Sequence, residues 1–205
     1  MAFFFVPVTK PHALRGALVS HALHLTRKRC PKKAAHHEPR EVGTVNVALI
    51  NPFLSSTISL FEQMFSVSPA PGEVYLDERA YTHRWDISAV MILTGNAIGV
   101  VAIRLTKLLA DKLLSISGVT WKTEDERLDL VNGMVGELVN VIASQASSRL
   151  VDYKINVSVP VVVQGKNHTI SWPDKQPIVA IPFTTNIGPF SVNVSLFELP
   201  KAYRV

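Results

Sequence analysis

Glu137 and Asn140 are the residues of this chain whose types and spacing most clearly offer chemistry. They lie three positions apart in residues 124–150, whose apolar pattern predicts a single long helix. Side chains three apart share a helix face, so an accepting carboxylate would stand beside a carboxamide that both donates and accepts hydrogen bonds. At about 100° per residue, the pair points away from the apolar side of the helix.

Small side chains surround this pair on the polar face of the predicted helix. The neighbours there are Gly133, Gly136, Ala143, Ser144 and Ser147. A glycine in a helix interior costs roughly 1 kcal/mol against alanine, which suggests that another molecule approaches closely. Two other interpretations stay open from the residues alone. Glu-x-x-Asn occurs by chance on ordinary solvated helices, and the glycines would also let a second helix of the same chain pack here.

Other residues that carry chemistry form less specific patterns. Imidazole and thiolate groups gather near the N-terminus, in His21, His24, Cys30, His36 and His37. Their spacing fits no zinc template, so no metal site is predicted. For His168, a locally bonded loop histidine is favoured over a general base. The chain has neither a Gly-x-Ser-x-Gly elbow nor a phosphate-binding glycine loop, so we predict no nucleophile and no cofactor of its own.

Length, composition and charge indicate one domain with a basic extension. The 205 residues are 47% apolar, enough for a single core. Residues 1–43 hold eight Lys and Arg against two acidic residues, a balance of +6, whereas the remainder has 13 basic and 14 acidic residues, a balance of −1. We expect a disordered extension over residues 1–43 and a folded domain over residues 44–205.

The position of the charge bears on the class of partner. Because the high pI belongs to the extension, it does not indicate a nucleic-acid-binding domain. The basic run from Arg27 to Lys33 would suit phosphates or an acidic membrane surface, but a solvated arm is favoured. An adaptor that acts through this arm stays an alternative.

Neither an export signal nor a membrane span is predicted. Residues 1–8 are apolar, but they lack a positively charged start, and Lys10 and Pro11 interrupt them before a secretory segment is complete. Cys30 is the single cysteine, so no internal disulfide can form, which suits a reducing compartment. The expected location is the cytoplasm.

Periodicity and turn residues predict the elements that position Glu137 and Asn140. Helical spacing occurs at residues 46–65, 107–116 and 124–150. Strands are predicted at 73–76, 85–93, 97–105, 155–163, 177–184 and 189–198. In the fourth of these, residues 155, 157, 159, 161 and 163 are expected on one face. The order predicts an α+β fold, a two-layer sandwich of long helices packed on a mostly antiparallel sheet.

The long helix is predicted with a defined start and a defined buried side. Thr123 and Glu126 form a capping box at its start. Its apolar side consists of Val131, Val135, Leu138 and Ile142. Burying four such residues contributes at most about 6 to 12 kcal/mol.

An ordered set of motifs accompanies the glutamate and the asparagine. The run Gly136-Glu137-Leu138-Val139-Asn140-Val141-Ile142-Ala143 resembles the Glu-x-x-Asn signature of the CheX/CheC chemotaxis phosphatases. Similar segments are Ile50-Asn51-Pro52-Phe53, Leu93-Thr94-Gly95 through Gly99-Val100-Val101, Val157-Ser158-Val159-Pro160 with Gly165-Lys166-Asn167-His168, and Gly188-Pro189-Phe190. The similarity covers about residues 45–198. It is closer to CheX, because CheC carries two copies of the signature, whereas here Glu62 is followed three residues later by Phe65.

The resemblance implies a protein phosphatase that hydrolyses the aspartyl phosphate of a phosphorylated CheY-type response regulator and so terminates a chemotaxis signal. Asn140 would orient the attacking water, and Glu137 would anchor the regulator's active-site lysine. The residues expected to contact the partner are Gly133, Gly136, Ala143 and Ser144. Gly133 stands where the family pattern often has Asp or Ser.

The same resemblance sets expectations for cofactors and assembly. Mg²⁺ is expected on the response regulator and not on this chain. A homodimer formed through the sheet is also expected. The alternative function is a non-catalytic response-regulator-binding or flagellar switch module.

Overall fold

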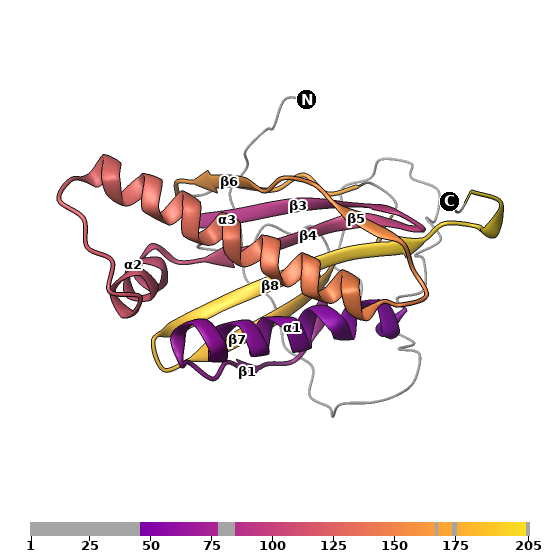
Figure 1. Cartoon of the computed structure of the whole chain (residues 1–205), viewed down its shortest axis with the longest axis horizontal. Helices are drawn as coiled ribbons and strands as arrows, with labels where there is room; N and C mark the ends of the chain where they lie inside the picture. Colours follow the sequence, from indigo (N-terminus) through magenta and orange to yellow (C-terminus); the bar gives the residue numbers. More distant parts are fainter. Residues whose placement is uncertain (1–45, 78–84, 167, 174–175, 204–205) are drawn as a thin grey trace, which may run out of the picture.

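Long helices cover one face of an antiparallel sheet, which confirms the predicted α+β two-layer sandwich (Figure 1). The computed structural model describes residues 46–77, 85–166, 168–173 and 176–203. The predicted extension over residues 1–43 lies outside these residues. Within them, no helix has both the length and the apolar character that crossing a membrane requires.

Three α-helices are described, and all three were predicted. They are α1 (Val47–Phe65), α2 (Lys107–Ile116) and α3 (Glu124–Arg149). Figure 1 shows α1 and α3 side by side over the sheet, with α2 close to the end where α3 begins. Each helix begins at a polar cap, which is Asn46 for α1, Thr106 for α2 and Thr123 for α3. In α2 the Thr106 hydroxyl accepts from the Leu109 N–H at 3.2 Å.

Eight strands form one sheet. They are β1 (Ala70–Pro71), β2 (Tyr75–Leu76), β3 (Ile87–Gly95), β4 (Ala97–Leu105), β5 (Ile155–Val157), β6 (Val161–Gln164), β7 (Val179–Thr185) and β8 (Gly188–Glu198). Their order is β1-β7-β8-β4-β3-β5, with β2 also paired to β7 and β6 to β3, and every pairing is antiparallel. The short strand β1 was not predicted, because its two residues lie in a Pro-rich turn.

The strands predicted at 85–93 and 97–105 form a hairpin at the centre of the sheet. Leu93 pairs with Gly99, and the chain turns at Gly95, whose φ is +122°. A Cβ at Gly95 would lie 2.0 Å from the Lys154 carbonyl oxygen, so both backbone conformation and space require glycine there.

The predicted strand over residues 155–163 is wrong in one respect. It is two strands, β5 and β6, separated at residues 158–160. Odd-numbered residues face the helices in β5, whereas an even-numbered residue does so in β6. Ile155, Val157 and then Val162 pack against the core, whereas Val159 is 80% and Val161 is 52% exposed. Pro160 interrupts the strand because it has no N–H to donate to a ladder, and the alternation restarts in the opposite phase.

The core lies between α1, α3 and the inner face of the sheet. The predicted apolar side of α3 is confirmed, because all its members are 0% exposed: Val131, Val135, Leu138 and Ile142. Beneath α1, the ring of Phe190 stacks on that of Phe61 at 4.3 Å between centroids and on that of Phe183 at 4.8 Å. The aromatic stack holds α1 on the sheet, and the four buried residues of α3 fix the orientation of that helix about its own axis.

Candidate functional site on helix α3

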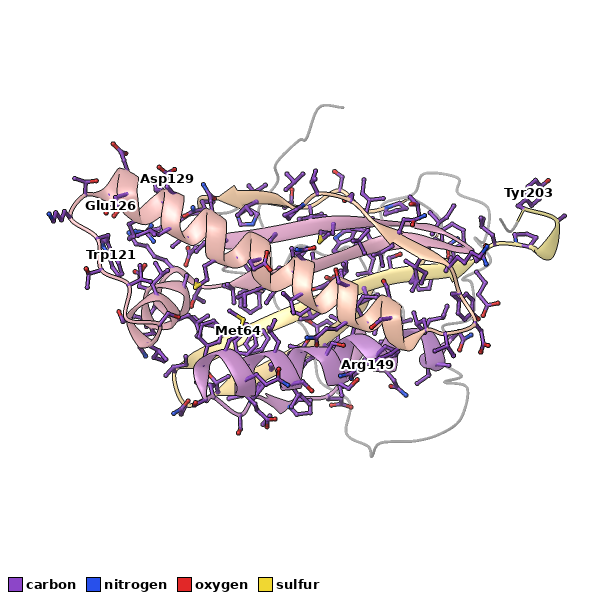
Figure 2. All side chains as sticks on the ribbon, viewed as in Figure 1. Met64, Trp121, Glu126, Asp129, Arg149 and Tyr203 are labelled. Atoms are coloured by element: carbon purple, nitrogen blue, oxygen red, sulfur yellow. The ribbon has the colours of Figure 1, made fainter. Side chains whose placement is uncertain are left out.

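Glu137 and Asn140 lie on the middle turns of α3, on the side that faces away from the sheet. Figure 2 labels Glu126 and Asp129 near the start of this helix and Arg149 near its end, and the two candidate residues lie between them. The Glu137 side chain is exposed, and Asn140 is half-buried. Because the opposite side of α3 is buried, Glu137 is presented to solvent and Asn140 in part.

The two candidate side chains are joined by a hydrogen bond. The Nδ2 group of Asn140 donates to Oε2 of Glu137 at 3.3 Å. This distance is at the long end of the range for an N–H···O bond, as expected for an exposed contact between side chains one turn apart. The structure thus brings together the two residues that the sequence singled out.

No cation of α3 neutralises Glu137. Between Arg127 and Arg149 the helix has neither Lys nor Arg, and the positions one turn from Glu137 are Gly133, Met134, Asn140 and Val141. The guanidinium of Arg127 binds Glu124 and Asp111, and that of Arg149 donates to the Ser55 hydroxyl at 2.5 Å. Among the described residues, no ion pair involves Glu137. Its negative charge is available to an outside group.

The four predicted contact residues divide into an exposed pair and a buried pair. Gly133 and Ser144 are exposed, and a Cβ at Gly133 would meet no atom within 4 Å. Ala143 is 0% exposed and Gly136 is buried, so the predicted contact of these two with a partner would need access that this structure does not offer. A Cβ at Gly136 would lie 3.4 Å from Val162 Cγ2, because α3 packs there against β6 and the turn before it. Gly136 therefore faces a neighbouring segment of the same chain and not open solvent.

The start of α3 is held by a cluster of charged groups. The Thr123 hydroxyl accepts from the Glu126 N–H at 3.1 Å, while the Glu126 carboxylate accepts from the Lys122 N–H at 2.8 Å, one residue earlier than in a standard capping box. Glu124 pairs with Arg127 and Lys107, both at 3.0 Å. Hydrogen bonds from Arg127 and then Lys107 lower the pKa of Glu124 to about 2.

Arg127 joins this cluster to α2, a role that the sequence analysis missed. Its guanidinium donates to Asp111 Oδ1 at 2.9 Å, and hydrogen bonding to Glu124 raises its pKa above the usual value. The Glu124 and Arg127 spacing is a visible local signal, because ions three residues apart on a helix can pair. The contact with Asp111 joins two helices and has no such signal.

A contact from β6 fixes the other flank of α3 and was also missed. The Gln164 side chain donates from Nε2 to the Leu128 carbonyl at 2.8 Å and to Asn132 Oδ1 at 2.9 Å. This contact lies two turns before Asn140. It holds the helix against the sheet without involving Glu137 or Asn140.

His168 belongs to the opposite face of the sheet. It is 8% exposed, and its ring nitrogens lie 2.7 Å from the Gly165 carbonyl and 2.6 Å from the Ser88 hydroxyl. Ser88 alternates along β3 with Ala89 and Met91, which point into the core beneath the helices. The locally bonded interpretation of His168 therefore fits, and this ring is not positioned to act beside Asn140.

No metal centre is assembled within the parts of the chain that the structure describes, where no three His, Cys, Asp or Glu side chains group as ligands. The histidines of the N-terminal segment and Cys30 lie outside those parts. A carboxylate and a carboxamide on an exposed helix face can bind a cation and hold a small polar molecule.

Comparisons with known proteins agree on one family. The profile of a family described as "Chemotaxis phosphatase CheX" matches residues 87–184. A CheX chemotaxis protein of Desulfovibrio desulfuricans has 30% identity and a TM-score of 0.66, over 73% of this chain and 99% of that one. A putative chemotaxis protein of Desulfovibrio vulgaris Hildenborough has 32% identity and a TM-score of 0.65, over 73% of this chain and 96% of that one.

A third structure holds a partner. It is a CheX–CheY–BeF3–Mg²⁺ complex from Borrelia burgdorferi, similar at 21% identity and a TM-score of 0.63, over 73% of this chain and 98% of that one. At this identity the likeness concerns the fold. No curated protein matches the sequence of this chain.

Proposed function

The chain belongs to the CheX family of chemotaxis phosphatases, and we propose from this premise that it hydrolyses the aspartyl phosphate of a CheY-type response regulator. The description of the family as a phosphatase supports hydrolysis. The complex of a similar fold with CheY supports the class of partner. A family member that terminates a chemotaxis signal in this way needs no cofactor of its own.

The reaction makes modest demands on the protein. A water oxygen forms a bond to phosphorus while the bond from phosphorus to the aspartyl oxygen breaks, and its electron pair stays on the carboxylate. The proton that the water loses leaves with inorganic phosphate or solvent. An acyl phosphate is already activated, and Mg²⁺ bound by the regulator offsets charge on the phosphoryl oxygens, as the Mg²⁺ in the Borrelia complex supports. What remains is a water held in line with the breaking bond.

Asn140 is the residue that we assign to this water. Its carboxamide can accept from one water proton, and it stands on a rigid helix whose buried side is fully packed. Glu137, one turn earlier, would bind the active-site lysine of the regulator through a charge-assisted hydrogen bond. The observation that carries the proposal is the hydrogen-bonded pair of Asn140 and an exposed Glu137 carboxylate that no described cation neutralises.

Gly133 and Ser144 complete the proposed docking surface. Gly133 lies one turn before Glu137 and Ser144 one turn after Asn140, and both are exposed. Because Gly133 has no side chain and open space around it, the main chain of α3 is accessible to a partner loop there.

The test measures phosphate release from a phosphorylated CheY-type regulator with and without this protein. Asn140→Ala should bind the regulator and lose about 10²-fold or more in kcat, the range seen when one transition-state contact is removed. Asn132→Ala is the matched control. It makes the same substitution on the same helix, but its carboxamide binds Gln164 and lies outside the proposed surface.

Three outcomes of this assay have distinct meanings. Loss of acceleration in Asn140→Ala and not in Asn132→Ala would support the assignment. Equal rates for wild type and Asn140→Ala would contradict it. Tight binding of phosphorylated regulator by the wild type without any acceleration would instead assign the non-catalytic binding or switch module.

We also propose that the protein forms a homodimer through the sheet. β6 is an edge strand of the described sheet, and its neighbourhood exposes Ile92 at 53%, Val159 at 80% and Val161 at 52%. Val161 pairs with Val90 on β3, and Ile92 follows Val90 at the strand period of two, so Ile92 and Val161 share the face away from the helices. An apolar edge of this kind favours pairing with a second copy about a twofold axis. The dimer would leave α3 free for the regulator.

A further inference from the structure

The hydrogen bond between Asn140 and Glu137 determines which end of the carboxamide faces Glu137. An ionised carboxylate only accepts hydrogen bonds, so the group of Asn140 that approaches it must be the NH2 group. The structure has this arrangement, with Nδ2 donating to Oε2 of Glu137 at 3.3 Å. The carbonyl atom Oδ1 of Asn140 is then the end that points away from Glu137.

Few groups of α3 compete for the Asn140 side chain. The positions one turn from it are Gly136, Glu137, Ala143 and Ser144. Gly136 and Ala143 have no polar side-chain atom, and the Ser144 hydroxyl makes no hydrogen bond with Asn140 among the described contacts. Glu137 is therefore the side chain of this helix that restricts the orientation of the carboxamide.

We propose that Glu137 is a positioning residue for Asn140, which it holds with Oδ1 outward before any regulator arrives. This inference rests on the proposed function and refines it. A water that donates a proton to Oδ1 keeps its lone pair free for phosphorus. A reversed carboxamide would donate from Nδ2 to the water oxygen, which occupies one of its two lone pairs and makes the water a weaker nucleophile. The orientation of one amide thus separates a productive water from an unproductive one.

Positioning and anchoring do not exclude one another. A carboxylate has two oxygens and about four acceptor sites, so Oε2 can keep Asn140 while Oε1 receives the ammonium of the regulator. Exclusion of water on docking strengthens both contacts, because electrostatic interactions weaken in a high dielectric. Glu137 consequently affects KM through the ammonium and kcat through Asn140.

The first test is a double-mutant cycle on dephosphorylation of the regulator. Without the carboxylate, Asn140 samples two common χ1 wells and two amide flips, roughly four orientations, so Glu137→Ala should lower kcat about fourfold and also raise KM. In the Asn140→Ala background, Glu137→Ala should raise KM again but leave kcat unchanged. Asp129→Ala is the matched control, because it removes another exposed carboxylate from the same helix (Figure 2) and should change neither constant.

The second test needs no regulator. The side-chain amide of Asn140 is followed by ¹⁵N NMR in the free protein, and the expected result is a shifted and more mobile Nδ2 resonance in Glu137→Ala but not in Asp129→Ala. An Asn140 amide that is unchanged by loss of Glu137, or a kcat effect of Glu137→Ala that persists without Asn140, would overturn the positioning role.

The two proposals can fail separately. If the NMR signal does not respond while Asn140→Ala still loses activity, the phosphatase assignment holds and Glu137 is an anchor alone. If Asn140→Ala hydrolyses phosphoaspartate at the wild-type rate, the proposed role of Asn140 in catalysis fails. The orientation of its amide by Glu137 would then have no effect on the reaction.

Discussion

Substitutions of Gly133 should affect the stability of the fold and the binding of a partner in different ways. The position is an exposed helix interior with no atom within 4 Å of an added Cβ, so nothing in the described chain requires glycine. Alanine should therefore stabilise the protein by about 0.8 to 1 kcal/mol, the difference in helix propensity. For a domain of this size, that gain corresponds to a rise in Tm of roughly 2 to 4 °C.

A longer side chain at the same position should affect docking. Gly133→Leu has nearly the same helix propensity advantage, but its branches extend over the surface beside Glu137. If a regulator loop packs there, displacing it costs about 1 to 3 kcal/mol, the usual penalty of overpacking. KM should then rise roughly 5- to 150-fold, because each 1.4 kcal/mol is about tenfold. kcat should change little, since Asn140 is untouched.

Gly136 provides the matched control for both measurements. A Cβ there would make ordinary contacts with Val162 at 3.4 Å and Pro160 at 3.5 Å, on the buried side of α3. Gly136→Ala should also stabilise the protein, because it removes the same glycine cost, and KM should stay at the wild-type value. Thermal unfolding and phosphate release give both quantities. An unchanged KM in Gly133→Leu, or an equal rise in Gly136→Ala, would refute the argument that Gly133 gives clearance to a partner.

Three further outcomes are expected. Val135→Asp should abolish cooperative unfolding in circular dichroism, because it places an unpaired charge at a position that is 0% exposed, whereas Glu137→Ala should change the free energy of unfolding by no more than about 0.5 kcal/mol. The pKa of Glu124 is lowered from 4.5 to about 2, so its stabilising contribution is present above pH 4.5 and is lost as pH falls through about 2. The stability difference between wild type and Glu124→Gln in denaturant titrations should accordingly shrink from pH 5 to pH 2, and a constant difference would contradict the ion pairing with Arg127. Val161→Lys should shift the sedimentation of a dimer to that of a monomer without loss of phosphatase activity, and an unchanged sedimentation coefficient would exclude the β6 edge as the interface.

Local patterns in the sequence predicted helix α3, which carries the candidate site, together with its buried side. The period of Val131, Val135, Leu138 and Ile142 predicted both the helix and its buried side, because side chains at this spacing share one face wherever the helix packs. Thr123 marked the start of the helix for an equally local reason, since a cap binds N–H groups two or three residues away. Glu137 and Asn140 were found by the same logic, as the polar residues of the opposite face.

Contacts between segments distant in the sequence decided what surrounds α3. Helix periodicity placed Gly136 and Ala143 near the polar face, but it does not show how far β6 and the turn before it extend around α3. Pro160 was visible in the sequence, yet the reversal of alternation from Val159 to Val162 depends on pairing with β3. The sequence alone thus determined which residues α3 contains and which side of it is apolar. Only the tertiary structure decided which of the remaining residues are exposed, because burial at the margin of a helix depends on the neighbours that the rest of the chain brings there.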